Sequence, residues 1–133
     1  MTKKKLLEVE YMISGDSIDE ETRDLIRDME IKFPEMTEEF KRLSVEQYVT
    51  FVKKQHDYGP SNIAMNTKLE TNEDLMMSLA GLVTRMNDKM SRLIHLILRT
   101  KKSPSNESVE DSFKDISVYG IISRIVTAGK WGK

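Results

Sequence analysis

Apolar residues recur at every third or fourth position along one long segment in the second half of the chain. This spacing places them on one side of a helix and predicts a helix over about 72–100. Thr71, with Asp74 three residues later, is the expected N-cap, and Lys101 begins the polar break that follows. The apolar positions are Leu75, Leu79, Leu82, Val83, Met86, Met90, Leu93, Ile94 and Ile97.

A second helix is predicted over about 106–128, and its apolar residues change side along its length. Val109 and Phe113 lie on its first apolar face, whereas Ile122 and Val126 extend the apolar surface around the remaining sides. A helix that is apolar on all sides is buried on all sides. We therefore expect this helix to be central in the fold or to lie in a dimer interface.

The first half of the chain contains a capping-box pattern, Ser17 followed by Glu20, which predicts the start of a helix. The helix is expected to continue to about Lys32, because Pro34 cannot be accommodated further along it. A short acidic turn or helix is expected over 38–43.

Ser44 followed by Gln47 is a second capping-box match, and it predicts a further helix that continues to about Gln55. The long connection that follows, 59–71, is expected to contain one helical turn at Ile63. A loop of this length in a compact domain is often functional.

Residues 4–13 alternate between apolar and polar types as in a strand. No second strand is evident, so this segment is either a strand that pairs across a dimer or a helix. The whole pattern predicts an all-α protein, a helical bundle of four to five helices with or without this short N-terminal strand. We expect a single domain over 1–133, in which 1–15 is an N-terminal segment, 16–45 an acidic helical part and 46–128 the helical core.

The amino-acid composition argues against several classes of function. The 21 basic and 22 acidic residues nearly cancel, which argues against general nucleic-acid binding. The chain has no Cys and two His, so neither a thiolate site nor a His-rich zinc site is expected. No apolar run approaches the roughly 20 residues that a membrane span needs, and no signal peptide is evident, so we expect a cytoplasmic protein.

Arg85, Lys89 and Arg92 fall within one narrow sector of the helix predicted over 72–100, beside its apolar face. Cations in a groove between helices suit phosphate groups, with Arg as a bidentate fork and Lys as a point charge. The alternative is an exposed face with ion pairs between these cations and Asp88, each worth about 0.2–0.5 kcal/mol.

Glu107, Asp111 and Asp115 follow one another at four-residue spacing on the last helix, and Ile122 and Val126 continue the same side. Carboxylates that run into an apolar region repel one another unless a cation neutralises them. Hard oxygen ligands at this spacing suit Mg²⁺, which commonly also takes substrate phosphates. The alternative is that these acids favour the helix N-terminus through its dipole, which explains the first turn better than it explains Asp115.

A third candidate is the turn formed by His56, Asp57 and Tyr58. Asp57 or His56 could act as a ligand or a base, and Tyr58 could stack on a nucleobase. Asn62, in the following connection, could hydrogen-bond to that base. The alternative is a plain helix stop with exposed polar side chains.

Three segments follow one another along the chain in a characteristic order. They are Lys54-x-x-Asp57-Tyr58-Gly59, Gly81-x-x-x-Arg85-x-x-Asp88-Lys89-x-x-Arg92-Leu93 and Asn106-Glu107-Ser108-x-x-Asp111-x-x-x-Asp115-Ile116-x-x-Tyr119. In this order and spacing, the chain resembles the nucleotide-modification-associated domain family over about residues 50–128. These are small helical proteins frequent in bacteriophages and prophages. The family is similar to the all-α NTP pyrophosphohydrolases of the MazG and dimeric dUTPase group, which cleave nucleoside triphosphates with Mg²⁺ held by carboxylates from two helices.

The resemblance implies a role for each matching position. The Mg²⁺ ion would be held by Glu107, Asp111 and Asp115, with Asp111 also catalytic. The nucleotide would be bound by Lys54, Asp57, Tyr58, Asn62, Arg85, Lys89 and Arg92, the last three at its phosphates. The chain departs from the pyrophosphohydrolase pattern because the second acidic motif, a Glu pair followed by another Glu, is missing. Asp88 would have to substitute as the second catalytic carboxylate.

Three functions follow as hypotheses. The first is a phage-type nucleotide-binding protein of nucleotide metabolism or DNA base modification, acting as a Mg²⁺-dependent nucleoside triphosphate pyrophosphohydrolase. The second is a non-catalytic protein that sequesters a nucleotide as an anti-defence sponge, which the missing acidic motif favours. The third is a purely structural helical oligomer. We expect a homodimer or higher homo-oligomer without membrane attachment, in the host cytoplasm if a phage encodes it.

Overall fold

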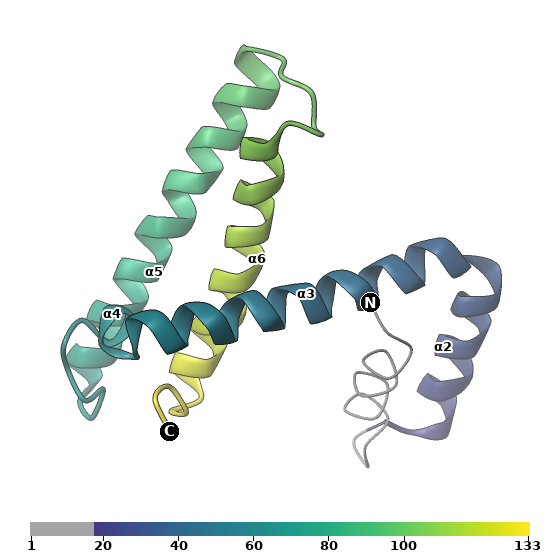
Figure 1. The fold of residues 1–133 in the computed structure, drawn as a ribbon. Helices are drawn as coiled ribbons and strands as arrows, with labels where there is room; N and C mark the ends of the chain where they lie inside the picture. Colours follow the sequence, from purple (N-terminus) through teal and green to yellow (C-terminus); the bar gives the residue numbers. More distant parts are fainter. Residues whose placement is uncertain (1–17) are drawn as a thin grey trace. The chain divides into compact units, whose positions relative to one another are not determined.

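The computed structural model describes residues 18–133, and within this range its regular secondary structure is helical with no strand. The predicted all-α fold of four to five helices is confirmed. The elements are α2 (Glu20–Lys32), α3 (Pro34–Tyr58), α4 (Ser61–Ala64), α5 (Asn72–Leu93), the π-helical segment η1 (Ile94–Arg99) and α6 (Glu107–Thr127) (Figure 1).

The expected strand at 4–13 and the expected cap Ser17 lie outside the described residues.

The chain divides into two compact units, 1–52 and 53–133, and each is described by itself. None of the helices within 18–133 is both long enough and apolar enough to cross a membrane.

In the first unit, local interactions define the ends of the helices. Asp19 is the N-cap of α2, and its carboxylate accepts a hydrogen bond from the Thr22 amide at 2.8 Å. Hydrogen bonding from Thr22 lowers the pKa of the Asp19 carboxyl. The predicted end of this helix at Lys32 is confirmed. Pro34 then begins α3, because its fixed φ suits the first position of a helix and its missing amide has no partner there.

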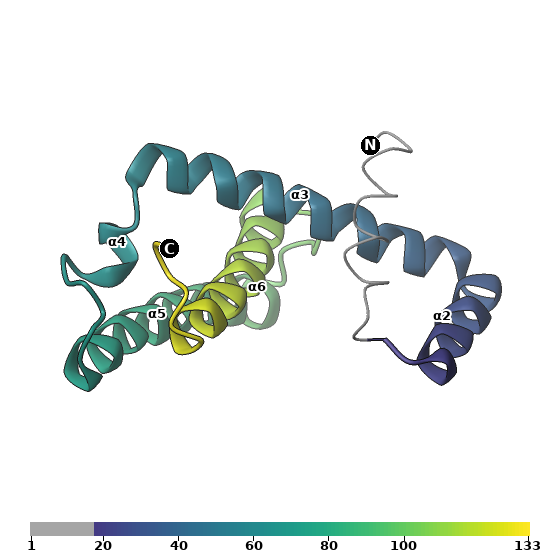
Figure 2. The ribbon, with the colours of Figure 1, turned by 90° about the horizontal axis from the view of Figure 1, so that it is seen from below.

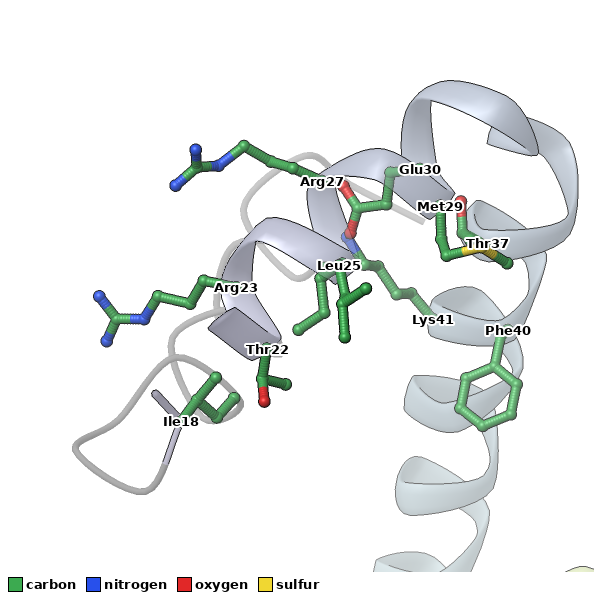
Figure 3. A pocket seen from close by; sticks show the side chains of 11 residues that line it. Ile18, Thr22, Arg23, Leu25, Arg27, Met29, Glu30, Thr37, Phe40 and Lys41 are labelled. Carbon is green, nitrogen blue, oxygen red and sulfur yellow. The ribbon is translucent and has the colours of Figure 1, made fainter. Parts of the chain in front are cut away.

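Within residues 18–52, α2 and the first turns of α3 bury no apolar core. No residue in 18–52 is buried, and Leu25 and Phe40 are 59% and 75% exposed. The Lys41 ammonium lies 2.7 Å from the Glu30 carboxylate and joins the two helices. A cavity of about 580 Å³ opens between them (Figure 3). Within residues 18–52, burial of apolar surface therefore contributes little to stability in the single chain.

α3 is one continuous helix, so the predicted helix start at Ser44 and the separate element predicted over 38–43 are wrong. The Ser44 hydroxyl donates a hydrogen bond to the Phe40 carbonyl at 2.8 Å, one turn back in the same helix. A serine in the interior of a helix can satisfy its hydroxyl in this way. The capping-box pattern at Ser44 therefore occurs without a break in the chain.

α5 and α6 lie side by side and antiparallel, and together they form the core of the second unit (Figures 1 and 2). α4 packs against α5, and the helical turn predicted at Ile63 is confirmed. The buried apolar residues are Ile63, Ala64, Leu82, Leu93, Val109, Ile122, Val126 and Trp131.

One side of α6 is buried and another is not. Val109 and Val126 are fully buried, whereas Phe113 and Ile121 are 53% and 54% exposed. A central helix, the first of the two predicted alternatives, is therefore not observed in the single chain. The second alternative, a dimer interface, stays a prediction.

Thr71 caps α5 as predicted, because its hydroxyl accepts a hydrogen bond from the Asp74 amide at 3.1 Å. We expect Thr71→Ala to lower the free energy of unfolding by about 1 kcal/mol, since the Asp74 amide loses this partner. Thr71→Ser keeps the hydroxyl and should remain close to wild type. Urea unfolding followed by circular dichroism measures both variants, and an unchanged midpoint for Thr71→Ala would show that the cap does not stabilise α5.

Candidate functional site

Asp115, on α6, is the point at which cations from two other helices meet. The Lys89 ammonium, from α5, lies 3.1 Å from Oδ2 of Asp115, and the Lys54 ammonium, from the last turns of α3, lies 3.8 Å from Oδ1. The side chains of Lys89 and Asp115 are each 23% exposed, whereas Lys54 is 53% exposed. One carboxylate is thus shared by two lysines, one of them largely shielded from solvent.

Arg85 lies one helical turn before Lys89, on the same side of α5. Its Nη2 atom donates to two oxygens of Asn62 in α4, the backbone carbonyl at 3.4 Å and the side-chain Oδ1 at 3.3 Å. Arg85 as a whole is half-buried. We call Lys54, Arg85 and Lys89 the cationic cluster.

Two hydrogen bonds from distant parts of the chain hold the backbone on either side of Asn62. The Ser78 hydroxyl donates to the Ile63 carbonyl at 2.6 Å, and the Trp131 indole N–H donates to the Pro60 carbonyl at 3.0 Å. Ser78 and Trp131 are both buried. Asn62 therefore projects from a backbone segment that is fixed at both ends.

The turn that follows α4 has a strained backbone. Met65, Asn66 and Leu69 have φ values of 55°, 61° and 55°, in the left-handed region that non-glycine residues seldom adopt. The Thr67 hydroxyl stabilises this turn by donating to the Ala64 carbonyl at 2.7 Å and accepting from the Leu69 amide at 3.2 Å. Residues in this conformation persist where the surroundings over-determine them, which is common at functional sites.

The remaining predicted site residues do not join the cluster. Asp57 lies 3.5 Å from the imidazole of His56, and both side chains are largely exposed. Tyr58 is 67% exposed. In the described part of the chain, no side-chain ion pair or hydrogen bond is formed by Asp88, Arg92, Glu107 or Asp111. The ion pairs considered between Asp88 and its neighbouring arginines are therefore not formed.

The carboxylates predicted to hold Mg²⁺ do not form one site. Glu107 and Asp115 are eight residues apart on α6, which separates them by about 12 Å along the helix, too far to share an ion with ligand distances near 2 Å. Both oxygens of Asp115 also face lysines. Among residues 18–133, no three Asp, Glu or His side chains converge on a metal position.

Sequence patterns missed two residues that shape this site, Ser78 and Trp131. A signal for Ser78 was present, because it is a polar residue among the apolar positions Leu75, Leu79 and Leu82 of one helix. A polar group at such a position requires a hydrogen-bond partner. Trp131 has no comparable signal, since its partner lies 71 residues away.

Comparison with protein-family models, curated proteins and solved structures found no match. The resemblance to the nucleotide-modification-associated domain family stays a prediction from the sequence. Within the fold, the cationic cluster and the residues around it form the candidate site.

Proposed function

We propose that the protein binds a nucleotide through its phosphate groups at the cationic cluster. The observation that carries this proposal is the unequal charge of the cluster: Lys54 and Lys89 share the single carboxylate of Asp115, and Arg85 bonds to the neutral Asn62. Three cations and one carboxylate leave an excess of two positive charges. A structural ion-pair network would be expected to balance its charges. An excess of cations, part of it shielded from solvent, suits a polyanionic ligand.

The cluster offers both kinds of phosphate contact. Arg85 presents a planar fork for two phosphate oxygens, and Lys54 and Lys89 are point charges. The Lys54–Asp115 distance of 3.8 Å is at the long end for an ion pair, and this lysine is half exposed. Lys54 can therefore turn toward a ligand at little cost, while Lys89 stays close to Asp115.

Exposed groups for the nucleoside lie next to this charge. Tyr58 follows Lys54 by four residues on α3, so the two side chains lie on the same side of the helix. The Tyr58 ring is 67% exposed and provides an apolar surface on which a base can stack. Asp57, also exposed, supplies an acceptor for a sugar or base. These positions match the roles that the family resemblance implies.

Of the two nucleotide hypotheses, sequestration without cleavage has the better support. The second acidic motif is missing from the sequence, and the three carboxylates predicted for Mg²⁺ are spread along α6. Binding by Lys54, Arg85 and Lys89 needs neither feature. In a phage context, such a protein would withhold a nucleotide from the host or supply it to base modification.

Lys89→Ala is expected to weaken nucleotide binding about 10- to 100-fold, because hydrogen bonds to charged groups contribute about 1.5–3 kcal/mol each. Arg124→Ala is the matched control, since it removes one exposed cation from α6 outside the cluster. Isothermal titration calorimetry with nucleoside triphosphates and cyclic nucleotides, with and without Mg²⁺, measures the affinities.

Three outcomes of this experiment are distinct. Binding without pyrophosphate release in the same samples supports sequestration. Binding with release establishes a pyrophosphohydrolase and names its substrate. If no nucleotide binds, or if Arg124→Ala weakens binding as much as Lys89→Ala does, the cluster is not a nucleotide site and the structural role gains support.

A further inference from the structure

Ser78 is a buried hydroxyl on α5 that bonds outside its own helix. It is 1% exposed, and its Oγ donates to the Ile63 carbonyl at 2.6 Å. By contrast, Thr84, Ser112 and Ser123 each donate to a carbonyl one turn back in their own helix, at 2.7–2.9 Å. That local bond is the usual way for a helical hydroxyl to be satisfied. Ser78 instead ties α5 to α4.

Arg85 lies two helical turns after Ser78, so both residues lie on the side of α5 that faces α4. Ser78 bonds to Ile63, and Arg85 bonds to both oxygens of the preceding residue, Asn62. Consecutive residues of α4 are thus held by one face of α5. α4 has only four residues, and so short a helix depends on contacts with other elements for its position.

We infer that Ser78 is a positioning residue for the cationic cluster. Its bond to the Ile63 carbonyl fixes α4, α4 presents Asn62, and Asn62 aligns the Arg85 guanidinium with a phosphate group. This inference rests on the proposed function, and it identifies Arg85 as the residue whose orientation Ser78 controls. Ser78 itself contacts no ligand. Without its hydroxyl, the Ile63 carbonyl loses its donor, and the Trp131–Pro60 hydrogen bond remains on only one side of Asn62. Asn62 is then held less firmly, and Arg85 must be ordered when the ligand binds.

The test compares affinities of the full-length protein for two probes, ATP and inorganic pyrophosphate. Ser78→Ala is expected to weaken both about three- to tenfold, the loss that corresponds to one neutral hydrogen bond, and Asn62→Ala should do the same. Because Ser78 acts through Asn62, the losses should be less than additive in the double variant, in which only the Asn62 backbone carbonyl still accepts from Arg85. Ser112→Ala is the matched control, because it removes a fully buried hydroxyl that bonds within its own helix.

Additive losses in the double variant would overturn the inference, and so would an equal loss in Ser112→Ala. A second readout needs no ligand. The Nε–H resonance of Arg85 should be sharp in the wild-type protein and in Ser112→Ala, and shifted or broadened in Ser78→Ala. If the wild-type protein binds neither probe, the proposed function fails, while a changed Arg85 resonance still supports the positioning role. An unchanged Arg85 resonance in Ser78→Ala would overturn that role whatever the affinities.

Discussion

Replacing Leu82 with alanine is expected to lower the free energy of unfolding by about 2–5 kcal/mol. Leu82 is 1% exposed and lies among the few fully buried apolar residues of the described chain. Its removal forfeits the transfer free energy of the side chain and leaves a cavity between packed helices. Small domains are stable by only about 5–15 kcal/mol, so this one change takes a large fraction of the total.

Val83→Ala is the matched control, because this residue directly follows Leu82 on α5 and is 61% exposed. Its expected effect is within about 0.5 kcal/mol, as for most exposed positions. Denaturant unfolding of the two variants compares the two sides of α5. Equal losses from the two variants would show that Val83 is as well covered as Leu82 in the folded protein, which contradicts the expected burial of one side of α5.

Trp131→Ala is expected to cost about 3–5 kcal/mol, the range for removing a large buried aromatic residue. The ring is 8% exposed, and its N–H donates to the Pro60 carbonyl at 3.0 Å. Trp131→Phe keeps most of the apolar ring and removes only the donor, so its expected cost is about 1 kcal/mol. The difference between the two variants separates packing from hydrogen bonding.

Hydrogen exchange locates this loss within the chain. In Trp131→Ala, amide protection should fall first in residues 59–71, which the indole N–H anchors at Pro60. Lys130→Ala, an exposed change one residue earlier, should leave the protection unchanged. Wild-type stability in Trp131→Ala would mean that Trp131 contributes nothing to the stability of the second unit.

Helix ends were predictable where a local hydrogen bond or a proline sets them. Thr71 and Lys32 mark boundaries that the structure retains, because capping and the geometry of Pro34 involve residues only a few positions apart. The same local rule failed at Ser44, where the hydroxyl bonds to a carbonyl of its own helix instead of capping a new one. A capping-box pattern does not distinguish these two uses of serine.

The sequence predicted several residues of the candidate site, but it did not predict which of them form ion pairs with one another. Helical periodicity placed Arg85 and Lys89 on one side of α5 correctly. Which acid meets them depends on the register between two antiparallel helices, and that register is decided by side-chain packing that no spacing in the sequence reveals. In the structure, Asp115 forms the ion pair with Lys89, and within residues 18–133 Glu107 and Asp111 form no ion pair. The contribution of Ser78 likewise required knowledge of which element packs against α5.

The hydrogen bond between Trp131 and Pro60 also gives the protein an optical reporter. The chain contains one tryptophan, Trp131, and its indole N–H is bonded to Pro60, two residues before Asn62. Indole emission changes with the polarity and hydrogen bonding around the ring, so the tryptophan fluorescence of this protein reports on one position, the hydrogen bond between Trp131 and Pro60. Movement of the segment that presents Asn62 would therefore alter the emission spectrum of the unlabelled protein.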